Sequence, residues 1–302
     1  MRALLKHRGA VTVTTDAPTP PLRHPTDVRV RVALAALCRT DLYAARGLLA
    51  TPDTIVLGHE FSGTIDAVGA EVHHLTPGDR VAVHPALPCL SCPHCPDRCQ
   101  HTRFLGVHRD GAFAEQVVVP AGAVHPLPDA LSFAQGAYAE PVAASLAVTK
   151  ALRPAEHPRV AIYGQGRIAE LTRRVLAAEG VSAPILGDAD LAEHDSDLDA
   201  IIETLATTDS IQRMALALRP SGLLVLKSRQ IEPVALNLAA LLPRELELRM
   251  VLYGAFGRGL ELMASGKLRV DDLCGPVHTL EDWEAAFHGD DERHKVFFDP
   301  TR

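Results

Sequence analysis

The 302-residue sequence has no long apolar run, few aromatic residues and no excess of positive charge. No stretch approaches the ~20 consecutive apolar residues that a membrane-spanning helix needs, so no membrane partner is expected. The formal net charge of −7 argues against nucleic acids and anionic membrane surfaces as the main partners. Residues 1–7, MRALLKH, lack the apolar core and cleavage site of a signal peptide, so a cytoplasmic location is expected.

The sequence also lacks internal repeats and low-complexity segments. Apolar residues make up 47% of the chain, which excludes extensive disorder, and the length suffices for two domains with ordinary cores. Cysteine is scarce, with six residues, but four of these fall between positions 89 and 99. In a reducing cytoplasm, clustered cysteines bind metal more often than they form disulfides.

The four clustered cysteines are Cys89, Cys92, Cys95 and Cys99. Their spacing brings four thiolates to one point, which suits a closed, tetrahedral structural zinc site. The same spacing, C-x2-C-x2-C-x3-C, also occurs in bacterial iron–sulfur ligand runs, although Gln100 stands here where those runs have proline. Structural zinc is favoured; an iron–sulfur cluster and an empty or partly occupied lobe remain alternatives.

A second metal site is indicated by Cys38 and the later Gly58-His59-Glu60. Taken singly, the cysteine and the histidine are better explained as core residues and the glutamate as a surface acid. Taken together they favour a metal. A catalytic zinc needs three protein ligands and one open position, and Glu140, before Pro141, is the candidate for the third ligand.

Hydrophobic periodicity indicates a mostly β N-terminal part. Residues 27–34 alternate valine or leucine with other residues, as a half-buried strand does, and residues 80–83 and 111–119 are further strand candidates. After about residue 150 the pattern changes to short apolar strands and helices, with predicted strands at 159–163, 184–186, 201–202, 223–226 and 246–252.

A glycine turn follows the predicted strand 159–163 and opens a predicted helix. Gly164 allows a tight turn, Gly166 allows the backbone to approach a pyrophosphate, and Ala169 allows close helix–strand packing. Asp188, at the end of the next strand, can bind the adenosine ribose hydroxyls. Residues 185–195 include no lysine or arginine that could bind a 2′-phosphate, so NAD is favoured over NADP.

The segment between Asp188 and Ile201 is too short for a crossover helix and another strand. A complete βαβ unit needs about 30 residues. We therefore predict that a helix and a strand of the dinucleotide-binding domain are missing or vestigial, which would leave the adenine side of the cofactor site open.

Motifs through nearly the whole chain resemble the zinc-containing medium-chain dehydrogenases/reductases, in the branch of sorbitol dehydrogenase. They are Cys38-Arg39-Thr40-Asp41-Leu42, Gly58-His59-Glu60-Phe61-Ser62-Gly63, Gly78-Asp79-Arg80-Val81, the cysteine cluster, Phe104-Leu105-Gly106-Val107, Asp110-Gly111-Ala112-Phe113-Ala114-Glu115, Glu140-Pro141 and the glycine turn. The cysteine cluster departs from the family pattern, with three residues before its fourth cysteine where the family usually has seven.

The resemblance implies an α/β protein with two domains. A GroES-like, mostly β catalytic domain would comprise residues 1–150 and 255–302, and a truncated Rossmann domain, a doubly wound parallel sheet, would be inserted at 151–254. It also implies a homodimer or homotetramer.

The resemblance further implies the roles of the site residues. Cys38, His59 and Glu140 match the ligands of the catalytic zinc, and Glu60 matches a residue beside the metal that sometimes replaces water on it. Thr40 matches the hydroxyl that relays the alcohol proton, and Asp41 would orient His59.

The implied reaction is reversible oxidation of a secondary alcohol, of polyol or cyclitol type, to a ketone with NAD(H). Two alternatives stay open. One is a degenerate scaffold of the same fold that binds cofactor poorly and acts as a binding protein; the other is a zinc-free enone reductase of the same superfamily.

Overall fold

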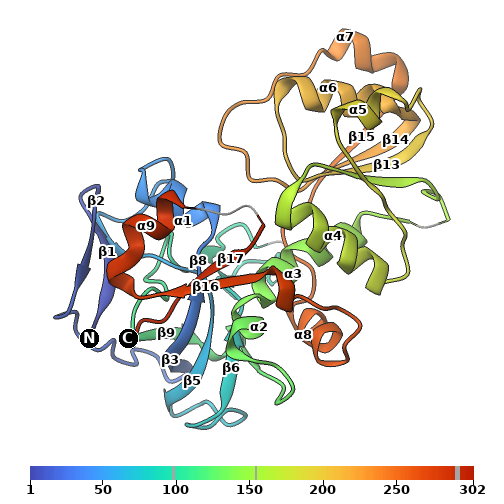
Figure 1. Cartoon of the computed structure of the whole chain (residues 1–302). Coiled ribbons are helices and arrows are strands. Elements are labelled where there is room, and N and C mark those ends of the chain that lie inside the picture. The colour runs from blue at the N-terminus through green and yellow to red at the C-terminus, as the bar shows by residue number, and fades with distance from the viewer. Residues whose placement is uncertain (97–98, 154, 290–292) are drawn as a thin grey trace. The chain divides into compact units, whose positions relative to one another are not determined.

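A computed structural model of the chain describes residues 1–96, 99–153, 155–289 and 293–302 (Figure 1). These residues divide into two compact units. The first combines Met1–Glu140 with Val270–Arg302, and the second is Pro141–Arg269. The first unit therefore uses both ends of the chain, and the second is inserted between them.

The limits of the second unit lie outside the interval 151–254 that the sequence indicated, because two flanking helices pack on each other. Helix α3 spans Ala139–Leu146 and α8 spans Phe256–Ala264. A Cβ added at Gly259 would lie 2.9 Å from Cγ1 of Val142, and the amide of Gly254 donates to the carbonyl of Ala143 at 2.7 Å. These contacts join α8 to the part of α3 that lies in the second unit, from Pro141 onward.

The first unit is built mainly from antiparallel strands. Among the described residues its largest sheet has seven strands, with the order β10-β6-β5-β3-β17-β16 and with β9 also paired to β3. The strands are β3 (Asp27–Ala36), β5 (Glu60–Val68), β6 (Arg80–Val83), β9 (Gln116–Pro120), β10 (Val124–Pro126), β16 (Cys274–His278) and β17 (Lys295–Phe298). The predicted strand at 27–34 is thus the centre of this sheet.

Smaller elements complete the first unit. A second sheet has the order β2-β1-β4, and β7 pairs with β8. The bounds are β1 (Ala3–His7), β2 (Ala10–Thr14), β4 (Thr54–Val56), β7 (Ala86–Leu87) and β8 (Arg103–Phe104), with short helices α1 (Arg39–Ala45), α2 (Phe133–Ala137) and α9 (Trp283–His288). Val28, Val30 and Val32 of β3 are fully buried in the core of this unit, as their alternation predicted.

The second unit contains a parallel sheet. Within residues 155–289 five strands pair in the order β12-β11-β13-β14-β15, and every pair is parallel. The strands are β11 (Val160–Tyr163), β12 (Ile185–Leu186), β13 (Leu198–Glu203), β14 (Leu218–Leu226) and β15 (Glu247–Met250), and the other helices are α4 (Gly166–Ala178), α5 (Asp188–Ala192), α6 (Thr208–Ala217) and α7 (Leu238–Leu241). Among the described helices of either unit, none combines the length and apolarity that crossing a bilayer requires.

The parallel sheet is covered on both faces. Val160 and Ile162 of β11 belong to a core with Leu176 of α4, whereas Ala161 and Tyr163 belong to a separate core with residues of α5 and α6. Because successive strand residues point to opposite faces, this alternation places helices on both sides of the sheet. The unit is therefore doubly wound, as predicted.

The predicted truncation is confirmed at the edge strand β12. After β12 the chain makes only the five-residue helix α5 and then returns to form β13 on the other side of β11. In the range 155–289, which is described without gaps, no strand pairs with the outer edge of β12.

The buried carboxylate of Asp199 ties together the starts of three strands. Its Oδ2 accepts the Arg159 backbone amide at 2.8 Å and the Arg159 Nε at 3.2 Å, and its Oδ1 accepts the Arg219 Nε at 2.6 Å. Burial raises the pKa of Asp199, but hydrogen bonds from the two arginines outweigh burial and lower the pKa below its ordinary value.

Replacing Asp199 with asparagine should lower the free energy of unfolding by about 1.5–3 kcal/mol at neutral pH, because the shape is kept and the charge-assisted hydrogen bonds are lost. Since folding depresses this pKa, the advantage of the wild type is present above the unfolded value of about 3.9 and is lost as the pH falls through the folded value. Urea unfolding at pH 7 measures the difference. The control is E261Q, at a side chain 70% exposed; equal unfolding midpoints for D199N and E261Q would contradict the assignment.

Candidate active site

The buried carboxylate of Asp41 joins two segments of the first unit. Asp41 lies in the first turn of α1, and its Oδ2 accepts the backbone amide of Cys38 at 2.9 Å. Its Oδ1 accepts the backbone amide of Gly58 at 3.2 Å and lies 3.0 Å from Nδ1 of His59. One fully buried side chain therefore positions the cysteine at the start of α1 and the histidine that precedes β5.

Gly58 allows the second segment to approach. Its φ is +93°, and a Cβ added there would lie 2.6 Å from Cδ1 of Phe113. A side chain at this position would collide with the aromatic ring, and the backbone angle would be strained for any other residue. The glycine is therefore required for His59 to reach Asp41.

The candidate ligand atoms of Cys38, His59 and Glu60 all lie within 4.8 Å of one another. Because Asp41 holds Nδ1 of His59, only Nε2 is left to face a ligand, and this buried atom has no hydrogen-bond partner in the part of the chain that the structure describes. A buried polar atom without a partner is costly. A divalent metal ion held by sulfur, imidazole and carboxylate would remove that cost, so the residues fit a metal.

The charges around Cys38 favour the thiolate. Burial raises the pKa of the Cys38 thiol, but the nearby charges of His59 and Lys295 outweigh burial and lower the pKa to about 6. Burial lowers the pKa of His59, whereas Asp41 and Cys38 raise it well above its ordinary value. Both shifts favour a thiolate beside a protonated imidazole when no metal is bound, and a metal ion would displace the imidazole proton.

Glu60 forms a buried ion pair that the sequence did not reveal. Its Oε2 lies 2.5 Å from Nζ of Lys295, and each side chain is only 1% exposed. Burial raises the pKa of Glu60, Lys295 lowers it, and the nearby charges of Cys38 and Glu140 raise it, with a net increase well above the ordinary value. The one sequence signal for Lys295 was a lone charge ahead of the apolar residues of β17.

The predicted catalytic metal site, with its one open position, is called the open site. Its other predicted residues lie close by but outside the group of Cys38, His59 and Glu60. Glu140 is buried in the first turn of α3, and its charge contributes to the raised pKa of Glu60. It is not among the residues whose ligand atoms lie within 4.8 Å. Thr40 is buried next to Cys38 in α1.

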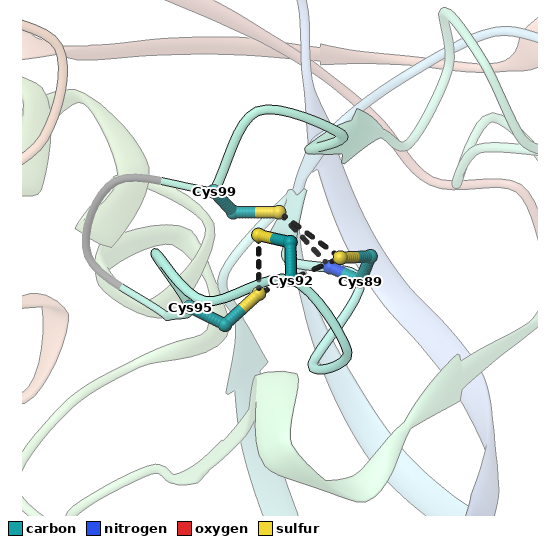
Figure 2. Close-up of side chains that lie close together, drawn as sticks. All are labelled: Cys89, Cys92, Cys95 and Cys99. Atoms are coloured by element: carbon teal, nitrogen blue, oxygen red, sulfur yellow. Dashed lines mark hydrogen bonds between the residues drawn. The ribbon is translucent and has the colours of Figure 1, made fainter.

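The four clustered cysteines converge on one point, as Figure 2 shows. The Sγ atoms of Cys89 and Cys95 are 3.5 Å apart, those of Cys92 and Cys95 are 3.4 Å apart, and those of Cys99 and Cys89 are 3.5 Å apart. Four sulfurs at ~2.3 Å from a tetrahedral zinc lie about 3.8 Å from one another. The shortened spacing therefore still permits a four-sulfur metal site; residues 97–98 lie outside the described part.

The glycine turn of the second unit leaves a helix N-terminus accessible to an anion. Gly164 has φ +137°, and a Cβ there would lie 2.2 Å from Oγ1 of Thr204. Gly166 has φ +76° and begins α4, a helix of 13 residues in which Ala169 is fully buried. Neither glycine carries a side chain, so the turn has the backbone geometry that a pyrophosphate at a helix N-terminus requires.

Asp188 begins α5 directly after the edge strand. Its Oδ1 accepts the hydroxyl of Tyr163 at 2.6 Å and lies 3.1 Å from Nη2 of Arg213, a residue of α6. Burial and this contact with Asp188 raise the pKa of Tyr163, so the phenol remains a donor. Residues 185–195 contain no basic side chain, but Arg213 reaches Asp188 from the later helix α6, a contact that sequence proximity does not reveal.

Comparison with known proteins matches residues 24–129 to the family model of the alcohol dehydrogenase GroES-like domain. The chain is 36% identical over 187 residues to galactitol 1-phosphate 5-dehydrogenase of Escherichia coli K12, an alignment that covers 61% of this chain and 54% of that protein. The chain thus spans about half the length of this curated relative.

Two further similarities cover most of the chain. It is 28% identical over 317 residues to D-xylulose reductase A of Aspergillus oryzae, covering 90% of this chain and 88% of that protein. A solved structure described as a zinc-binding dehydrogenase from Sinorhizobium meliloti 1021, bound to NADP, superposes with a TM-score of 0.86 at 25% identity and covers 99% of each chain.

The matched family model, these relatives and the two units agree with one another and with the order of motifs along the sequence. A GroES-like unit carries the cysteine, histidine and glutamate group, and a Rossmann unit carries the glycine turn. Residues 24–129 therefore belong to the alcohol dehydrogenase GroES-like domain family, and the chain has the fold of the zinc-binding dehydrogenases.

Proposed function

We propose that the chain is a zinc-dependent oxidoreductase that interconverts a secondary alcohol of polyol or cyclitol type and a ketone, with NAD(H) as the hydride carrier. The observation that supports this most strongly is the group formed by Cys38, His59 and Glu60, in which the buried Nε2 of His59 makes no hydrogen bond among the described residues. The polyol class is supported by the names of the curated relatives, which refer to galactitol 1-phosphate and D-xylulose.

Cys38 and His59 would hold the metal with a carboxylate as the third ligand. Glu140 is our candidate for that carboxylate, and Glu60 would act beside the metal, since Lys295 already neutralises it. Asp41 keeps Nδ1 of His59 engaged, so the imidazole presents Nε2 to the ion. When bound, the ion would lower the pKa of the alcohol, and the nicotinamide would accept the hydride.

Thr40 would carry the alcohol proton away. It is buried in the first turn of α1, next to the ligand Cys38. Its hydroxyl can accept the proton of the substrate hydroxyl and donate its own outward, so it changes no charge in the site. As the carbon–hydrogen electron pair leaves with the hydride, the substrate carbon becomes the carbonyl carbon of the ketone.

The second unit would bind the cofactor through the glycine turn and Asp188. Gly164, Gly166 and Ala169 would let the pyrophosphate rest on the N-terminus of α4, and Asp188 would accept a ribose hydroxyl. A zinc-free enone reductase is less well supported because it does not need the metal-ligating group. A cofactor-poor scaffold is less well supported because it needs neither that group nor the helix N-terminus for a pyrophosphate.

We also propose that the chain forms a homodimer or homotetramer. Strand β15 is the last strand of the parallel sheet in the described range 155–289, and it exposes Leu248 and Met250, the latter by 81%. An exposed edge strand with apolar side chains is a surface that pairing with a second copy would cover.

Replacing Cys38 with serine should abolish turnover and remove about one of two bound zinc ions per chain, because the open site loses its thiolate. Wild type and variant are screened with polyols, cyclitols and their ketones in the presence of NAD(H) or NADP(H), and metal content is measured by mass spectrometry. C274S is the matched control, at a cysteine that belongs to neither metal-ligating group of the described residues. Equal turnover and metal content in wild type and C38S would refute the proposed mechanism.

Replacing Asp41 with asparagine should weaken metal binding by about 10–100-fold, because partners that orient a ligating histidine contribute that much to affinity. Competition with a zinc chelator measures this affinity without any assay of activity. The control is D66N, whose carboxylate is paired with Arg29 and Arg31 away from the open site. An unchanged affinity in D41N would show that Asp41 does not position His59 for a metal.

Replacing Cys92 with serine should remove the other zinc ion and lower the thermal midpoint, while cobalt substituted into the open site keeps its absorption spectrum. This follows because the four-cysteine site is closed and structural. An iron–sulfur cluster would instead give a visible chromophore in the wild type as purified, which C92S would lose. If the wild type holds a single metal ion, and this ion is lost in C38S and kept in C92S, the alternative that the four clustered cysteines bind no metal would be favoured.

A further inference from the structure

Arg213 and Asp188 form an exposed ion pair at the place where the adenosine ribose of a bound dinucleotide would lie. Asp188 starts α5 immediately after β12, and Arg213 reaches it from α6 with a distance of 3.1 Å from Nη2 to Oδ1. The side chain of Arg213 is 46% exposed and that of Asp188 is 58% exposed. Ion pairs this exposed contribute little to folding, so the fold does not explain why the arginine is here.

The shortened Rossmann unit creates this pair. Because α5 is only five residues long and the chain goes directly to β13, α5 contacts α6. Leu191 of α5 shares a core with Ile211 and Met214 of α6, the residues on either side of Arg213 in its helical turn. The arginine is therefore held at the Asp188 carboxylate by the packing of α5 on α6.

We propose that Arg213 binds the 2′-phosphate of NADP(H), so that the enzyme uses NADP(H) as well as NAD(H). This inference rests on the proposed dinucleotide site of the second unit. An aspartate alone would repel a 2′-phosphate by like charge, which is how such a residue excludes NADP. Here a guanidinium already touches that aspartate, and it can exchange the carboxylate for the phosphate, to which arginine binds in a two-pronged, charge-assisted way.

The same pair remains compatible with NAD(H). Tyr163 and Arg213 both contact Oδ1 of Asp188, so a ribose hydroxyl can still donate to Oδ2. The arginine then stays on the carboxylate and neutralises part of its charge. The residue thus switches its partner according to whether the ribose carries a hydroxyl or a phosphate.

The test is a fluorescence titration of NADH and NADPH, with adenosine 2′,5′-bisphosphate as a competitor of bound NADH. We expect the wild type to bind NADPH within about tenfold of NADH. R213A should weaken the binding of NADPH and of the bisphosphate by about tenfold or more, and it should change the affinity for NADH by no more than about threefold. The reason is that only the phosphate loses a hydrogen bond to a charged group. R213K keeps the charge without the two-pronged geometry, so its affinity for NADPH should lie between those of the wild type and R213A.

The matched control is R258A, because Arg258 is 42% exposed and forms an ion pair at 2.8 Å with Glu179, away from Asp188. It should leave both affinities unchanged, and circular dichroism checks that all variants fold. If R213A leaves the ratio of NADPH to NADH affinity unchanged, the inference is overturned while the proposed function stands. If the wild type binds neither NADH nor NADPH, the proposed function is overturned together with it.

Discussion

The open site depends on one buried carboxylate that serves three donors. Asp41 accepts the amides of Cys38 and Gly58 and holds Nδ1 of His59, so it determines both where the thiol and the imidazole lie and which ring nitrogen is left for a metal. A fully buried negative charge is costly unless it is satisfied in this way. The charge of Asp41 raises the pKa of His59, and the charge of His59 lowers the pKa of Cys38. The site is therefore prepared to exchange a proton for a metal ion.

The second unit has a shortened parallel sheet that ends at the edge strand β12. The parallel order around β11 is retained, and so are the glycine turn and the acid that follows β12. Next to β12, α5 and α6 pack on each other and bring Arg213 to Asp188. The contact between these two helices therefore places a guanidinium beside the acid that follows the edge strand.

Patterns within a few residues of the sequence were sufficient to predict the elements whose geometry is set locally. The strand around Val30, the glycine turn at Gly164 and the convergence of the clustered cysteines depend on spacing within a few residues, so a single sequence reveals them. The ion pairs Glu60–Lys295 and Asp188–Arg213 depend instead on packing between distant segments, to which no periodicity points. The third metal ligand stays a proposal for the same reason, because Glu140 lies on a separate helix outside the close group.

The central claim is that Cys38 and His59 share a divalent metal ion. Anomalous X-ray scattering from crystals of the zinc-loaded protein, recorded above and below the zinc edge, tests this most directly. A peak is expected about 2.3 Å from Sγ of Cys38 and about 2.1 Å from Nε2 of His59, in addition to one at the four clustered cysteines. Well-ordered side chains at Cys38 and His59 with no anomalous density between them would contradict it.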